Sequence, residues 1–102
     1  MIYVIATSQV KPECREKFIE LAKNNLPNVH AEKGCIMYQL CNDFESGFPV
    51  QEKCGGNALV FIECWENIDC LKAHLQTPHM QKFSADVKDL RISSSLKVLT
   101  EV

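Results

Sequence analysis

The sequence has little of what nucleic-acid-binding and membrane proteins need. Its 102 residues contain 11 Lys and Arg against 13 Asp and Glu, a net charge of -2. Clustered cations to neutralise phosphates are therefore missing, and we expect no nucleic-acid partner. No apolar run approaches the roughly 20 residues that cross a bilayer, and Met1 leads directly into a strand-like segment rather than a signal peptide. We expect a cytoplasmic protein with no membrane association.

Internal repeats, linkers and paired metal-binding cysteines are also missing. A chain of 102 residues with no repeat is expected to form one domain over residues 1–102. Its six cysteines include no CxxC pair and match no zinc-binding pattern, so we expect no metal site. Most of them lie beside apolar residues and are expected to be free thiols that behave as small apolar side chains. Cys54 differs, because it lies in a polar, Gly-rich segment where exposure is expected.

The first third of the chain predicts a strand followed by a helix. Ile2–Val10 is rich in β-branched residues and is expected to form a strand. From Cys14 onward, apolar residues recur at steps of three and four, which predicts an amphipathic helix with Phe18, Leu21, Ala22, Leu26 and Val29 on its buried side. Pro27 falls inside this pattern and should kink the helix or break it near Leu26. Gly34 supplies the C-terminal stop.

The middle of the chain contains two further strands separated by a long loop. Ile36–Asn42 predicts the second strand, and Ala58–Glu66, with a nearly continuous apolar run, predicts the third. Residues 43–56 contain three of the four glycines and predict a loop. A short edge strand around Val50 is the alternative for this segment.

The last third predicts two helices and a final strand. Asn67 is placed to cap a short helix, and Thr77 followed by Pro78 predicts the start of a second one with Met80, Phe83, Val87 and Leu90 on its apolar side. Leu96–Val102 predicts the fourth strand. The resulting order, β-α-β-β-α-β, is typical of the split-βαβ, ferredoxin-like α+β fold.

Apolar residues are consecutive in the predicted strands instead of alternating with polar ones. Such runs occur in the first three strands, at 4–6, 36–38 and 59–62. Both faces of the sheet must then be covered, but the helices of one small chain can cover only one face. The other face would leave an apolar patch that monomers rarely tolerate. We therefore expect a homodimer that packs sheet against sheet.

The segment from Phe61 to Phe83 resembles the antibiotic-biosynthesis monooxygenase superfamily, most closely its small bacterial quinol monooxygenases. The resemblance covers nearly the whole chain and is weakest at residues 43–57. The features that carry it are Glu63-x-Trp65 at the end of a strand, Leu71-x-x-His74, Thr77-Pro78-His79-Met80, Glu32-x-Gly34-Cys35 and Tyr38.

The resemblance implies a dimeric ferredoxin-like α+β barrel with a buried pocket between sheet and helices in each subunit. Many members of the superfamily oxidise electron-rich aromatic rings with molecular oxygen and use neither metal nor flavin. No cofactor is therefore expected, and the ligand is expected to be a small aromatic or quinone-like molecule. Such a site requires an apolar slot, one general base and a few orienting donors.

Three candidate site residues alternate along the third predicted strand. Phe61, Glu63 and Trp65 share one face, so a carboxylate lies between two aromatic side chains. Glu63 is a candidate base, or alternatively a carboxylate paired with a Lys or a backbone amide at the sheet end. Trp65 matches a family position that lines the pocket, whereas without that match core packing would be favoured.

Two histidines lie on either side of the predicted break between the last two helices. His79 is the second residue of its helix, where the positive end of the helix dipole favours a neutral imidazole, the form that accepts a proton. Both His74 and His79 are candidates for catalysis. The alternative is that one or both only hold the helix junction together. Their spacing across a turn is not that of a helical metal-binding pair.

Other residues complete the predicted pocket. Thr7, Tyr38 and Phe83 are candidate substrate-binding residues at positions that match the family. Phe44 and Phe48 lie in the long loop, which is expected to form a lid or a dimer contact, or simply to cross the surface.

The leading hypothesis is a cofactor-independent monooxygenase acting on a quinol or similar aromatic. An oxygen-independent isomerase of a small hydroxyketone is an alternative, because a relative that processes a phosphorylated autoinducer sugar shares the His-x-x-Thr-Pro-His pattern seen at His74–His79. A non-enzymatic, ligand-binding dimer is the third possibility. Haem degradation is disfavoured, since Thr7 and Ser84 stand where haem-degrading relatives have Asn and the His ligand.

Overall fold

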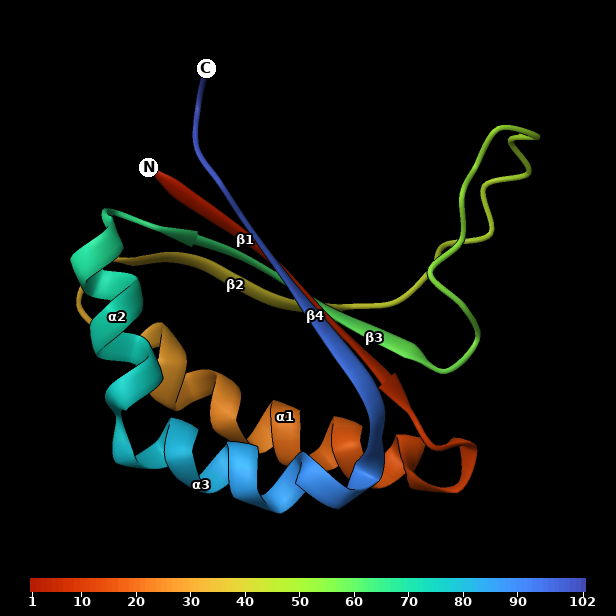
Figure 1. The fold of residues 1–102 in the computed structure, drawn as a ribbon, viewed down its shortest axis with the longest axis horizontal. Helices are drawn as coiled ribbons and strands as arrows, with labels where there is room; N and C mark the ends of the chain where they lie inside the picture. The colour runs from red at the N-terminus through yellow and green to blue at the C-terminus, as the bar shows by residue number, and fades with distance from the viewer.

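The computed structural model describes residues 1–102 and contains four strands and three α-helices (Figure 1). The strands are β1 (Ile2–Val10), β2 (Cys35–Cys41), β3 (Ala58–Trp65) and β4 (Arg91–Leu99). The helices are α1 (Arg15–His30), α2 (Ile68–Gln76) and α3 (Pro78–Val87), with short 3-10 turns at Pro12–Cys14 and Lys88–Leu90. No helix has both the length and the apolar character needed to cross a membrane.

The strands form one antiparallel sheet in the order β2-β3-β1-β4. Together with the helix positions, this order confirms the predicted ferredoxin-like α+β fold. All three helices lie on one side of the sheet, and the other side carries no helix (Figure 1). The sheet therefore has a helix-covered face and an open face.

Strand alternation determines which side chains occupy each face. The β1–β3 register pairs Val4 with Glu63 and Ala6 with Phe61, and these residues face the helices. A single core forms on this side from Val4, Val10, Phe18, Ala22, Val29, Tyr38, Leu59, Phe61, Trp65, Leu71, Phe83 and Val87. The intervening residues occupy the open face, where the pairs Tyr3–Cys64, Ile5–Ile62 and Thr7–Val60 lie side by side. The open face is thus largely apolar, as the strand sequences predicted.

The predicted interruption of the first helix does not occur. α1 continues through Pro27 to His30. A proline lacks one backbone donor, but the loss falls in the last turn of α1, where Pro27 still accepts a hydrogen bond from Ala31 at 3.2 Å. Burial of Val29, which has no exposed surface, holds this last turn against the core. The third helix, in turn, ends at Val87, and the predicted apolar position Leu90 falls in the following 3-10 turn.

The fourth strand was predicted at Leu96–Val102 but occupies Arg91–Leu99. Pairing with β1 extends it backward across the polar segment Ser93–Ser95, which has no apolar pattern to predict a strand. β4 ends at Leu99, where its antiparallel partner β1 begins, because Leu99 pairs with Tyr3. Tertiary pairing therefore overrides local propensity at both ends of β4.

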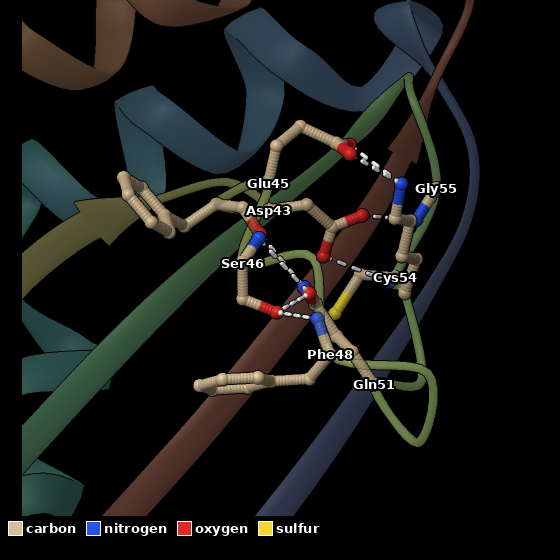
Figure 2. A network of polar contacts seen from close by, with 9 residues as sticks. Asp43, Glu45, Ser46, Phe48, Gln51, Cys54 and Gly55 are labelled. Carbon is tan, nitrogen blue, oxygen red and sulfur yellow. Dashed lines mark hydrogen bonds and ion pairs between the residues drawn. The ribbon is translucent and has the colours of Figure 1, made fainter.

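The long loop between β2 and β3 contains no edge strand at Val50, so the alternative considered for residues 43–56 is wrong. Instead, the loop is held by its own polar side chains (Figure 2). The Asp43 carboxylate accepts backbone hydrogen bonds from Cys54 and Gly55, both at 2.9 Å, and these bonds lower the pKa of Asp43. An ion pair of 2.6 Å between Lys53 and Glu45 adds a second cross-link. The loop projects beyond the open side of the sheet (Figure 1).

The turn between α1 and β2 packs closely against α2. Gly34 adopts a φ of 79° in this turn, and its carbonyl accepts a hydrogen bond from Glu66 at 2.9 Å. A Cβ built at Gly34 would collide with the Cys70 side chain, at 2.8 Å from its Cβ and closer still to its sulfur. Only glycine permits both the positive φ and this approach. The contact brings the segment around Glu32 within reach of α2.

We expect Gly34→Ala to lower the free energy of unfolding by roughly 2–4 kcal/mol, because it adds a steric clash to the backbone strain. The matched control is Gly47→Ala, since Gly47 has a similar φ of 77° but no atom within 4 Å of the added Cβ. That variant should lose only about 1 kcal/mol. Urea unfolding of both variants measures the difference, and equal losses would show that the Cys70 contact is unimportant.

Candidate functional site

A cavity of about 300 Å³ lies between the helix-covered face of the sheet and helices α2 and α3. This volume is at the lower end of the range for small-molecule sites, so a ligand of one or two aromatic rings fits it. The cavity is lined by Ala6, Thr7, Ser8, Tyr38, Phe61, Glu63, His74, Leu75, Met80, Phe83, Ser84, Arg91, Ser94, Ser95 and Leu96. Six of the eight residues predicted from sequence for catalysis or substrate binding line this cavity: Thr7, Tyr38, Phe61, Glu63, His74 and Phe83.

Aromatic side chains form the inner wall of the cavity. The Tyr38 and Phe61 rings lie 5.1 Å apart, and the Phe61 and Phe83 rings meet edge to face at 6.1 Å. Both distances are within the range of favourable aromatic pairs. Tyr38 and Phe61 are almost fully buried, at 3% and 6% exposed. The wall is therefore a rigid apolar surface against which a planar ring can stack.

Glu63 is the one carboxylate that lines the cavity, and it is 5% exposed. Its Oε1 accepts a hydrogen bond of 2.9 Å from Trp65 Nε1, two residues along β3 on the same face. Burial raises the pKa of Glu63 to about 6, against the lowering effect of the Trp65 bond, and the charge of Glu32 raises it further. Neither a lysine nor a backbone amide pairs with it, unlike the alternative considered from sequence. A carboxyl group that titrates near pH 6 is suited to proton transfer.

His74 is the second titratable side chain deep in the cavity, and its position depends on Glu32. His74 is 1% exposed, and its ring lies 4.6 Å from the Trp65 ring. Its Nδ1 lies 2.8 Å from Glu32 Oε2. Because an ionised carboxylate only accepts hydrogen bonds, Nδ1 carries the proton of the neutral ring, and Nε2 is left as an acceptor. Nε2 has no partner within the chain and is free for a ligand.

Tyr38 provides a neutral donor in the same wall. Desolvation raises the pKa of its hydroxyl, and the charges of Glu63 and Glu32 raise it further, so the phenol keeps its proton. The hydroxyl makes no hydrogen bond within the chain, while the Tyr38 carbonyl pairs with His30 at 2.8 Å. A ligand oxygen can therefore take the place of solvent as its partner.

Three predicted site residues have a different relation to the cavity. His79 does not line it: its Nε2 lies 3.3 Å from Glu32 Oε2, the same oxygen that His74 contacts, and its Nδ1 contacts Asn25 at 3.0 Å. Trp65 has no exposed surface and reaches the cavity only through its bond to Glu63 and its ring contact with His74. Thr7 borders the cavity, but alternation turns its side chain to the open face of the sheet, beside Val60.

Two features of the site have no signal in the sequence pattern. Glu32 lies 42 positions from His74 in a charged turn, so only the fold brings them together. Arg91 and the serines of β4 precede the apolar end of that strand and have the composition of a polar surface segment. The nearest available signal for Glu32 was the family motif Glu32-x-Gly34-Cys35, which gives the residue no role.

Cys54 is exposed, as predicted. It forms no disulfide, and neither do the other five cysteines. Partial desolvation of the thiol and then the nearby charge of Asp43 raise the pKa of Cys54. Both effects oppose formation of the reactive thiolate. In this loop Cys54 contributes its backbone donor to Asp43 (Figure 2).

Comparison with known proteins identifies the family of this fold and cavity. The family model described as antibiotic biosynthesis monooxygenase matches residues 1–86, most of the chain. This chain belongs to the antibiotic biosynthesis monooxygenase family. An Escherichia coli K12 relative of the family, named "Probable quinol monooxygenase YgiN", is 34% identical over 101 residues, which are 97% of this chain and 96% of YgiN.

Solved structures agree with the fold assigned to this antibiotic biosynthesis monooxygenase family member. A crystal structure of a conserved protein from Methanosarcina mazei Go1 superposes with a TM-score of 0.86 at 22% identity, over 99% of this chain and 92% of that one. A crystal structure described as an antibiotic biosynthesis monooxygenase gives a TM-score of 0.82 at 23% identity, over 100% and 99% of the two chains. At these identities the similarity establishes the shared fold.

The raised pKa of Glu63 predicts a pH-dependent effect of Glu63→Gln on stability. Because the folded pKa of about 6 exceeds the ordinary value of 4.5, the folded state favours the protonated carboxyl. The stability contribution of Glu63 is therefore greatest below pH 4.5 and is lost as the pH rises through 6. Glutamine remains neutral and keeps an acceptor for Trp65. The free energy of unfolding of Glu63→Gln, relative to wild type, should therefore rise by roughly 2 kcal/mol when the pH is raised from 4 to 7.5.

Urea unfolding at the two pH values measures this gain. Glu66→Gln, which removes the exposed carboxylate just after β3, is the matched control. A stability difference between Glu63→Gln and wild type that stays constant with pH would contradict the raised pKa.

Proposed function

We propose that this protein is a cofactor-independent monooxygenase that oxidises a quinol or another small electron-rich aromatic with molecular oxygen. The observation that carries the proposal is the meeting of two proton acceptors, His74 Nε2 and the Glu63 carboxylate, with a stacked aromatic wall in one small cavity. An apolar slot with a base and an orienting donor is what deprotonation of a hydroquinone requires.

The proposed reaction begins with transfer of a hydroxyl proton from the quinol to the base. The resulting anion gives one electron to O2, and the two radicals combine by forming a carbon–oxygen bond. The peroxide anion takes back the proton held by the base. The ring carbon that carries it then loses its hydrogen as a proton while the O–O bond breaks, so the outer oxygen leaves as water and a hydroxyquinone remains. One oxygen atom enters the ring, the other becomes water, and the quinol supplies all four electrons.

Within this scheme each polar residue has one task. His74 takes the proton at Nε2, because Glu32 holds the proton of the neutral ring at Nδ1, and the same Glu32 carboxylate stabilises the imidazolium that forms. Glu63 accepts a hydrogen bond from a second substrate hydroxyl once it is ionised, above about pH 6. Tyr38 donates its hydroxyl proton to a substrate oxygen and so orients the ring.

The name of the E. coli relative supports the same class of substrate. YgiN is named as a probable quinol monooxygenase, and it is aligned over almost its full length with this chain. The family model, in turn, is named for monooxygenases. A quinol is therefore the first substrate class to test with this protein.

We further propose a homodimer in which the open faces of two sheets pack together. Tyr3, Ile5, Val60, Ile62 and Cys64 make this face apolar, and no helix covers it (Figure 1). The adjoining loop exposes Phe44, Phe48 and Val50 at 80%, 70% and 93%. A second copy of the same face is a complementary cover, and twofold packing buries both copies at once. We keep the cytoplasm as the proposed location, because all six thiols are free, as a reducing compartment maintains them.

Oxygen uptake with the hydroquinone form of menadione tests the enzymatic proposal. His74→Gln should lower kcat by about 10²-fold or more, because it removes the proton acceptor. His30→Gln, which changes a histidine outside the cavity, should stay within about twofold of wild type. Rates without enzyme, measured in parallel, give the spontaneous oxidation. Equal rates for wild type, His74→Gln and buffer would refute the proposal, and turnover that persists without oxygen would point to an isomerase.

Sedimentation equilibrium at micromolar concentration tests the dimer. The wild type should have the mass of two chains, and Ile62→Lys, which places a charge at the centre of the open face, should have the mass of one. Ile68→Lys is the matched control, because Ile68 is 42% exposed at the start of α2, on the side of the helices. A monomeric wild type, or a dimeric Ile62→Lys variant, would contradict sheet-to-sheet packing.

A further inference from the structure

The outer end of the cavity has a different chemistry from its inner wall. Its lining residues with the greatest exposure come from β4 and from the facing sides of α2 and α3, including Leu96 at 59% and Leu75 at 50%. Ser84 and Ser94 at this end are also exposed. The deep residues Tyr38, Phe61, Glu63 and His74 are all less than 10% exposed. The cavity therefore opens between α3 and β4, and its mouth is lined by hydroxyl groups.

Arg91 is the one Lys or Arg that lines this cavity. The β1–β4 register pairs it with Val10, a core residue with no exposed surface, so Arg91 points to the helix-covered face of the sheet. The β1–β4 register shifts between Gln9 and Val10, opposite the start of β4. Arg91 is half-buried, as its position at the mouth requires.

No acidic side chain neutralises Arg91. Every ion pair within the chain involves other residues, and Arg91 makes no side-chain hydrogen bond. Other basic side chains, such as Lys53 and Lys82, are paired with Glu45 and Asp86 at the surface, both at 2.6 Å. The guanidinium therefore presents all of its donors to the mouth of the cavity and the solvent beyond it.

We propose that the natural ligand is an aromatic hydroxyl compound with a carboxylate at the end of the ring system opposite its reacting hydroxyl. The ring packs on Tyr38 and Phe61, the hydroxyl reaches His74 and Glu63, and the carboxylate binds Arg91 with the serine hydroxyls around it. This inference rests on the proposed function for the identity of the reacting end, and it adds the substrate class.

Three properties of the site favour a carboxylate. A planar guanidinium matches a carboxylate with two parallel hydrogen bonds, and such charged pairs are stronger than neutral ones. Serine hydroxyls at the mouth can donate to the remaining lone pairs of the anion. The anion also stays at the opposite end of the ligand from the Glu63 carboxylate, which would repel it.

Binding measured without oxygen tests the ligand class independently of turnover. The probes are 6-hydroxy-2-naphthoate, with its hydroxyl and carboxylate at opposite ends, and 2-naphthol, which lacks the carboxylate. Calorimetry with the full chain should show that wild type binds 6-hydroxy-2-naphthoate at least tenfold more tightly than 2-naphthol. Arg91→Met should remove this preference and leave 2-naphthol binding within about twofold, whereas Arg91→Lys should keep part of it. Lys88→Met, which changes an exposed cation outside the cavity, is the matched control and should retain the preference.

Equal affinity of wild type for the two probes, or an undiminished preference in Arg91→Met, would overturn the inference. Oxygen uptake then separates it from the proposed function. If 1,4-dihydroxynaphthalene and its 6-carboxylate are both oxidised with the same KM, the monooxygenase proposal holds and the carboxylate inference fails. If the carboxylate probe binds through Arg91 but neither hydroquinone is oxidised faster than in buffer, the ligand class holds and the enzymatic proposal fails.

Discussion

The hydrogen bond between Glu32 and His74 is the interaction on which the organisation of the site depends. It joins the turn after α1 to the last turn of α2, two segments that no backbone pairing connects. It also determines which nitrogen of His74 faces the cavity as an acceptor. The close approach at Gly34 allows this bond, since a larger residue would push the turn away from Cys70. A packing constraint outside the cavity thus controls the proton chemistry inside it.

The sheet provides two surfaces with separate roles. Its helix-covered face places Phe61 and Glu63 next to each other in one wall, because residues two apart on β3 point the same way. Carboxylate burial in that wall raises the pKa of Glu63, which is unfavourable for stability at neutral pH but useful for proton transfer. The open face has no buried carboxylate; it is apolar along β3 and most of β1, and β4 adds Lys97 and Ser95 beside Ile5 and Thr7. One antiparallel sheet therefore borders a polar-lined cavity on one side and presents a largely apolar surface on the other.

Much of the fold follows from local sequence patterns, and the site follows only in part. β1 and β3 were predicted closely because β-branched and other apolar residues dominate their sequences. β4 was misplaced, since its first half is polar and becomes a strand only through pairing with β1. Alternation correctly brought Phe61 and Glu63 to one face. Glu32 and Arg91 were missed, because only contacts between distant segments bring them to the cavity. His79 was predicted to be in the pocket, but it lies outside the cavity, against Glu32.

The two ends of the cavity belong to different structural elements. The deep end is built from β2, β3 and α2, where each residue is also part of the core, so substitutions there endanger folding. The mouth is built largely from an edge strand and the exposed side of α3, whose side chains contribute little to the core. Substitutions at the mouth can therefore change the shape and polarity of the cavity entrance while the core beneath it stays intact. The least constrained strand of the sheet is the one that shapes the entrance.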